Sequence, residues 1–307
     1  MALTCFSIAR ERKWLTIPGM MISALPSPRL FLLRLPALLC LLMAALSLPA
    51  PPTHAGDRDR IEAFLEVTGF DVALDSIAFS AGAAPRFLGL EPDAFGADWE
   101  RLTDEVFDTG VMRVIALDIL EKTLDDEALN HAAGFYASEL GQRLVEAENL
   151  SHMIKDDEIK TAQGLSLIED MQQEGSDRLT QLRRMNAAID ATNASLRALQ
   201  EVQVRFLMAA SAAGVIELRV DIDEMRARMK QQEGRWRQIL EQSGLAGSAF
   251  TYRDFSDADV TAYADALEEP LMRRVYELLN AVQYEIMANR FEILASRMAD
   301  LHPEQDI

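Results

Sequence analysis

The chain of 307 residues contains two cysteines, Cys5 and Cys40, and both lie within its first 55 residues. Residues 56–307 therefore have no thiol that could form a disulfide, attack a substrate as a thiolate or bind zinc. The same stretch has three histidines, His131, His152 and His302, and no H-E-x-x-H or similar spacing joins them. We therefore expect no metal or organic cofactor, and little material for Ser-His or metal-assisted catalysis.

Basic residues are also scarce, since 30 Lys and Arg stand against 49 Asp and Glu and give a formal charge of −19. Five of the basic residues and one acidic residue precede position 56, which leaves 25 basic and 48 acidic residues beyond it, a charge of −23. Binding to nucleic acid depends on Lys and Arg that neutralise phosphate. The composition thus argues against nucleic acid and favours a cationic partner.

The first 55 residues have the pattern of a secretory signal peptide. Arg29 and Arg34 precede an apolar run over residues 35–48, and three prolines then lead to a small-residue site that ends at Ala55. A charged region, an apolar region and such a site are the three parts of a signal peptide. We predict cleavage after Ala55 and a periplasmic location.

Two alternatives concern the same region. A retained membrane anchor would need about 20 apolar residues, whereas this run is shorter and contains Pro36. Membrane contact is therefore expected only through the uncleaved signal segment. Met20 and Met21 lie just before a signal of ordinary proportions, so residues 1–19 are consistent with a misassigned start codon.

Apolar residues beyond position 56 recur every three or four positions, and alternating strand patterns are missing, which predicts an all-α helical bundle. Turn signals are expected at residues 82–85, 89–92 and 244–247. The periodicity predicts helices over residues 57–78, 92–121, 126–153, 156–173, 176–213, 215–243, 256–268 and 270–301.

Two stretches of this pattern resemble each other. Residues 126–149 align without gaps on residues 257–280, and six positions are identical, among them Asn149 with Asn280. Each stretch opens with an acidic helix start, Thr123-x-x-Asp126 and Ser256-x-x-Asp259. We predict an internal duplication into two helical units in tandem, 56–155 and the more diverged 156–307.

The first unit resembles a known bacterial family. Residues 124–129 (LDDEAL) and 135–144 (FYASELGQRL) are similar to the signature of the domain-of-unknown-function family 2059, which has an acidic helix start and then Phe-Tyr-x-Ser-Pro-x-Gly-Gln. The resemblance extends over about residues 57–149. It implies a small, helical, exported protein without established chemistry, and no catalytic residue is carried over from it. Glu139 replaces the usual proline, so the helix is expected to continue through this point.

The motif within this resemblance is the candidate functional surface, since amide and small residues beside an aromatic pair can form a polar-rimmed pocket. A structural role, with a close helix contact at Gly141, is the favoured interpretation, because no base or nucleophile lies near. Adjacent helix positions point about 100° apart, so only one of Phe135 and Tyr136 can lie centrally in the core. The candidate residues are Phe135, Tyr136, Ser138, Gly141 and Gln142.

These observations predict a non-enzymatic, exported helical protein that binds a cationic envelope protein or an apolar ligand between its helices. The alternative is a hydrolase or lyase that acts on cell-envelope polymer with paired carboxylates, which need neither cysteine nor histidine. The acidic residues near positions 146–160, Glu148 included, are predicted to form a solvated face or a helix junction.

Overall fold

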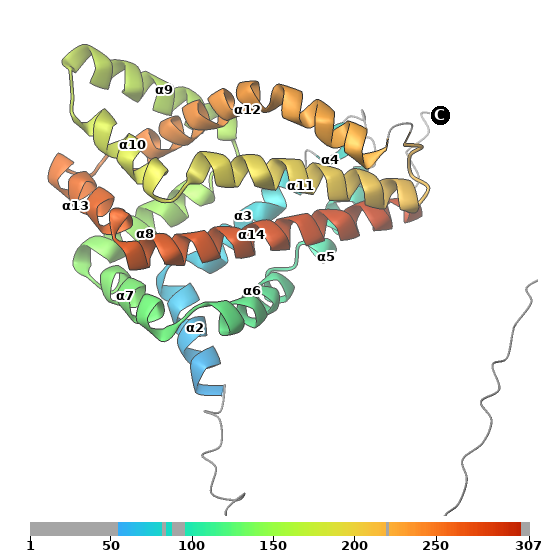
Figure 1. The fold of residues 1–307 in the computed structure, drawn as a ribbon, viewed down its shortest axis with the longest axis horizontal. Coiled ribbons are helices and arrows are strands. Elements are labelled where there is room, and N and C mark those ends of the chain that lie inside the picture. Colours follow the sequence, from blue (N-terminus) through green and yellow to red (C-terminus); the bar gives the residue numbers. More distant parts are fainter. Residues whose placement is uncertain (1–54, 82–83, 88–95, 219–220, 302–307) are drawn as a thin grey trace, which may run out of the picture. The chain divides into compact units, whose positions relative to one another are not determined.

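Helices make up all the regular structure in the residues that the computed structural model describes, which are 55–81, 84–87, 96–218 and 221–301 (Figure 1). This confirms the predicted all-α class. The predicted signal peptide lies outside the described residues, except for Ala55, where the first helix begins. The helices are α2 (Ala55–Val67), α3 (Phe70–Ala81), α4 (Ala84–Phe87), α5 (Gly96–Val106), α6 (Thr109–Thr123), α7 (Asp126–Tyr136), α8 (Glu139–His152), α9 (Asp157–Glu174), α10 (Arg178–Ala188), α11 (Ala191–Ala212), α12 (Ile222–Thr251), α13 (Asp257–Glu268), α14 (Pro270–Arg297) and the 3-10 turn η1 (Met298–Asp300).

Several helices begin at a side chain that accepts a hydrogen bond from the backbone of the first turn, as N-cap residues do. The predicted capping box at Ser256 and Asp259 is present at the start of α13. The other predicted start is wrong in detail, because Asp125 caps α7, whereas the Thr123 hydroxyl donates to the carbonyl of Ile119 in the preceding helix.

Four of the predicted helices are each interrupted once. The interruptions lie at residues 68–69, 107–108, 137–138 and 189–190. At two of them a residue has a left-handed backbone, Gly69 with φ of 69° and Asp190 with φ of 49°. Such a residue ends a helix without disturbing the spacing of apolar side chains. For this reason the periodicity alone joined helices that are separate.

The prediction that the helix continues through Glu139 is wrong. Helix α7 ends at Tyr136, and α8 begins at Glu139 after Ser138, whose hydroxyl oxygen accepts from the backbone N–H of Gly141 at 3.1 Å. A serine N-cap thus starts the new helix without the proline that the family pattern has at this point.

The predicted turn at 244–247 is also wrong, because α12 runs unbroken through these residues to Thr251. One of its small residues, buried Ala246, packs against α9. A Cβ at Gly164 of α9 would lie 2.1 Å from the carbonyl oxygen of Ala246. Helices α9 and α12 therefore approach closely enough for backbone contact.

One hydrophobic core extends from Ile61 to Met298 and includes buried residues of both predicted units. Helix α14 packs along α11 and also contacts α5, α6 and α7, so it joins the two parts of the chain (Figure 1). Thr53–Ile307 accordingly form one compact unit. Within the described helices, none is long and apolar enough to cross a bilayer.

Candidate functional site

Four of the five tyrosines of the chain converge on the carboxylate of Glu148, which lies in α8. Tyr136 ends α7, Tyr252 follows α12, Tyr263 lies in α13 and Tyr276 lies in α14. Tyr136 and Tyr263 are almost fully buried, and the other three side chains are half-buried. We call these five residues the tyrosine-glutamate cluster.

Hydrogen bonds connect the whole cluster. The hydroxyls of Tyr252 and Tyr263 donate to the same oxygen of Glu148, Oε1, at 2.7 and 2.9 Å. The Tyr276 hydroxyl lies 2.8 Å from that of Tyr263 and also shares a hydrogen bond with the Tyr136 hydroxyl. Residues from both halves of the chain thus form one polar network.

Burial changes the acidity of the network. Removal from water raises the pKa of Glu148, although the hydrogen bonds from Tyr252 and Tyr263 act in the opposite direction. Burial, followed by the charge of Glu148 or of neighbouring phenols, raises the pKa of all four tyrosines above its ordinary value. The phenols therefore remain neutral hydrogen-bond donors near neutral pH.

A cavity of about 350 Å³ opens beside the cluster. Its wall includes all five cluster residues together with side chains and backbone from α3, α8, α9, α10, α12 and α14. The equivalent residues Asn149 and Asn280 both line it, as do Lys160 and His152. Volumes of this order and a few convergent polar groups are typical of small-ligand sites.

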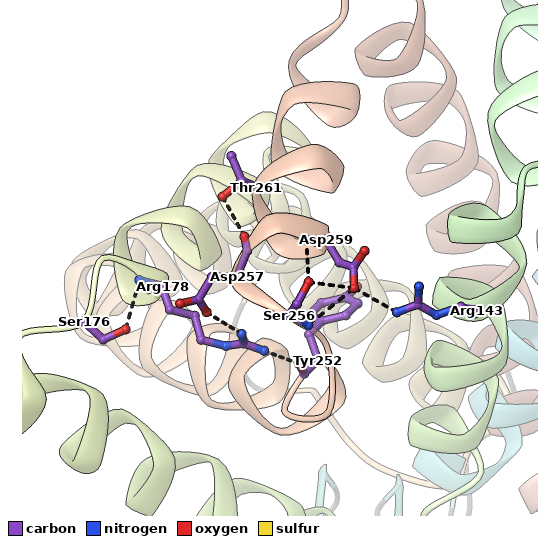
Figure 2. Close-up of polar contacts among 8 residues, drawn as sticks. All are labelled: Arg143, Ser176, Arg178, Tyr252, Ser256, Asp257, Asp259 and Thr261. Atoms are coloured by element: carbon purple, nitrogen blue, oxygen red, sulfur yellow. Dashed lines mark hydrogen bonds and ion pairs between the residues drawn. The ribbon is translucent and has the colours of Figure 1, made fainter.

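Two arginines hold the start of α13 next to this cavity, and Figure 2 shows them from either side of the helix start. Arg143 of α8 donates to Asp259 at 2.9 Å, and this bond is the main reason that the pKa of Asp259 is lowered. Arg178 of α10 donates to Asp257 at 2.7 Å and also to the carbonyl of Tyr252. These bonds lie within the segment 252–263, which carries Tyr252 and Tyr263, and tie it to α8 and α10.

The residues predicted as candidates lie at the junction of α7 and α8. Tyr136 has the central position in the core, and Phe135 lies at its margin, where its ring stacks on Tyr263 with centroids 5.8 Å apart. Ser138 caps α8, and a Cβ at Gly141 would lie 2.3 Å from the carbonyl oxygen of Phe135. Gln142 is exposed. Of the five, the structure brings Tyr136 alone into the wall of the cavity.

Glu148 is the residue that sequence reasoning misplaced, since it belongs to the cavity wall and not to a solvated acidic face. The signal was present, because Glu148 follows Gly141, Leu144 and Val145 at helical spacing, and all three are buried. An acidic residue on an apolar stripe is a candidate buried carboxylate. No comparable pattern links the four tyrosines, which come from separate helices.

The geometry places Tyr136 and Glu148 in the part of the chain that carries the family resemblance. Residues 111–155 match the model of a family described as an uncharacterized protein conserved in bacteria, DUF2059. The predicted resemblance is confirmed, over a shorter stretch than the 57–149 expected. The matched segment provides Tyr136 and Glu148, and residues beyond it provide the other three tyrosines. No curated protein and no solved structure matches the chain.

The chemistry open to the site follows from its residues. Among the described residues that line the cavity, Glu148 is the one carboxylate, so this wall lacks the pair that the predicted glycosidase-like alternative requires. The described residues also contain no cluster of three metal-binding side chains. A carboxylate within a hydrogen-bonded phenol network is suited to holding a polar ligand.

Proposed function

We propose that this chain is an exported, periplasmic, non-enzymatic binding protein that takes a small polar ligand into the cavity beside Glu148. The single observation that supports this most strongly is the tyrosine-glutamate cluster in the wall of a cavity of about 350 Å³. The proposal replaces the apolar ligand expected from the sequence with a polar one, because amide, hydroxyl and charged groups line the space. Export is supported by the signal-like pattern of residues 1–55.

The cost of building such a cluster supports a binding role. A carboxylate taken out of water loses solvation, and the loss is offset only in part by two phenol hydrogen bonds. A core of apolar residues would avoid this cost. Perturbed carboxyl groups in a cleft are accordingly more frequent at functional sites than elsewhere.

The binding function is testable by thermal shift with a library of small polar metabolites of all charge types. The full chain is expressed with its natural N-terminus and purified in the form that the cell accumulates. Gly247 lines the cavity, and a Cβ there would meet nothing within 4 Å, so Gly247→Leu should fold and fill the ligand space. Gly134→Leu is the matched control, because Gly134 is also open but lies on the exposed surface of α7.

We expect one or more library compounds to raise the melting temperature of the wild type and of Gly134→Leu, but not of Gly247→Leu. A library without any such compound would contradict the proposed function.

Export is tested separately by cell fractionation and N-terminal sequencing, for which the expected first residue is Gly56 in the periplasmic fraction. A cytoplasmic product that retains Cys40 would contradict it.

A further inference from the structure

The ionised form of the Glu148 carboxyl group has no counter-charge among the described residues. Among the described residues, no lysine, arginine or histidine forms an ion pair with it, although Lys160 and His152 line the same cavity. Both hydrogen bonds that it accepts go to Oε1. The second oxygen, Oε2, accepts none from a described residue, and it is not among the buried polar atoms that lack a partner. Oε2 is therefore an open acceptor at the cavity wall.

The direction of the phenol protons can be deduced from the same bonds. Tyr263 donates its only proton to Glu148, so in its contact with Tyr276 the oxygen of Tyr263 accepts. Tyr136 and Tyr276 then have one proton each for the three contacts that join Tyr136, Tyr263 and Tyr276. Both of these protons stay within the three phenols, while Tyr252 donates to Glu148 separately.

In this arrangement every hydroxyl proton of the cluster is already used within the protein. The cluster offers its ligand only lone pairs and one negative charge. A carboxylate or phosphate ligand would place acceptors against acceptors, whereas a protonated amine would supply both the missing donors and the missing charge. The net charge of −19 also favours approach of a cation to the protein.

We infer that the ligand of this cavity contains a protonated amine whose N–H groups donate to the open oxygen of Glu148. The inference rests on the proposed function and narrows its ligand to one chemical class. Binding of the amine replaces the solvation that Glu148 loses and supplies a counter-charge to its carboxylate.

Fluorine NMR of the full chain labelled with 3-fluorotyrosine tests this inference, because the cluster contains four of the five tyrosines and Tyr284 lies outside it as an internal control. The probes are n-butylammonium, n-butyrate, n-butanol and tetramethylammonium, the last a cation without N–H groups. Single Tyr→Phe variants assign the resonances.

Butylammonium is expected to shift the cluster resonances and leave that of Tyr284 in place, with butyrate and butanol inactive and tetramethylammonium at least tenfold weaker. Glu148→Gln should weaken butylammonium binding at least tenfold, and Glu146→Gln, an exposed change in the same helix, should not alter it. The inference of a protonated amine is wrong if butylammonium does not shift the cluster resonances, or if it binds Glu148→Gln as tightly as it binds the wild type. If a library compound binds but butylammonium does not, the proposed binding function still holds and only the inference about the amine fails.

Discussion

The helix pairs α7–α8 and α13–α14 have the same register but different junctions. Both pairs begin one residue after an N-cap, and on the ungapped alignment Asp126 corresponds to Asp257 and Glu139 to Pro270. The core faces correspond as well, since Tyr136 and Leu267 are both buried. This register fits the predicted duplication, which stays a prediction.

The junctions themselves are made differently. In the first pair Ser138 caps α8, and Gly141 lies against the carbonyl of Phe135. In the second pair Pro270 stands at the first helical position without a capping side chain, and fully buried Met272 replaces Gly141. The same interruption can thus be made by a cap with a close backbone contact or by a proline.

Four of the five cluster residues are also divided between the pairs, and Tyr252 lies outside both. Tyr136 and Glu148 of the first pair correspond to Leu267 and Leu279 of the second, whereas Tyr263 and Tyr276 correspond to Ala132 and Val145. Each pair thus has polar side chains at positions where the other pair has apolar ones. The comparison teaches that a polar site can form between two similar apolar frames when each contributes different side chains.

The largest effect should come from truncation of the central core residue in each pair. We expect Tyr136→Ala to lower the free energy of unfolding by about 3–5 kcal/mol and the equivalent Leu267→Ala by about 2–5 kcal/mol. Phe135→Ala should also destabilise, but less, because its ring lies at the margin of the core. Urea denaturation measures the free energy of unfolding of all three variants. A larger loss for Phe135→Ala than for Tyr136→Ala would contradict the central position of Tyr136 in the core.

Gly141→Ala should be the next largest change. Its Cβ would lie 2.3 Å from the carbonyl oxygen of Phe135 and 2.6 Å from Cα of Tyr136, so α8 must shift, at a cost of about 1–3 kcal/mol. In Gly134→Ala the Cβ meets nothing within 4 Å, and the helix should gain about 0.5–1 kcal/mol. Thermal denaturation that shows stabilisation of both variants would rule out the close contact.

The junction caps predict a smaller difference. Ser138→Ala removes the bond to the N–H of Gly141 and should cost about 1 kcal/mol, the usual value of an N-cap. Glu269→Ala, at the equivalent position, should be close to neutral, since its side chain makes no capping bond. Equal costs in chemical denaturation would show that the junctions are more alike than their structures indicate.

The smallest effect is a dependence on pH. Because the pKa of Glu148 is raised in the folded protein, its contribution to stability is present below the ordinary glutamate value of about 4.3 and is lost as pH rises through the raised pKa. Wild type should therefore lose stability relative to Glu148→Gln as pH rises above about 4.3 and through the raised pKa. Urea titrations over a range of pH measure this difference, and a difference of opposite sign would contradict the burial argument.

Helical class and most helix locations could be predicted from the sequence, because apolar periodicity and the Ser256 capping box are local signals. The interruptions at Gly69 and Asp190 could not, since a single left-handed residue leaves that periodicity intact. The helix through Gly244 and Gly247 was missed because its packing against other helices outweighs the low helix propensity of glycine. Tyr136 was a candidate, whereas Tyr252, Tyr263 and Tyr276 join it through tertiary contacts that no local spacing encodes.

The position of α14 has a consequence for the order of folding. Its contacts with earlier helices span most of the chain, as in the pairing of Arg297 with Glu105 at 2.6 Å across 192 positions and the contact of Phe291 with Phe107. Contacts so distant in sequence form slowly and late. Helices α5, α6 and α7 therefore lack their contacts with α14 until the C-terminal helix has been synthesised. Pulsed hydrogen exchange during refolding should show α6 and α7 gaining protection together with α14, and earlier protection of α6 and α7 would disprove this order.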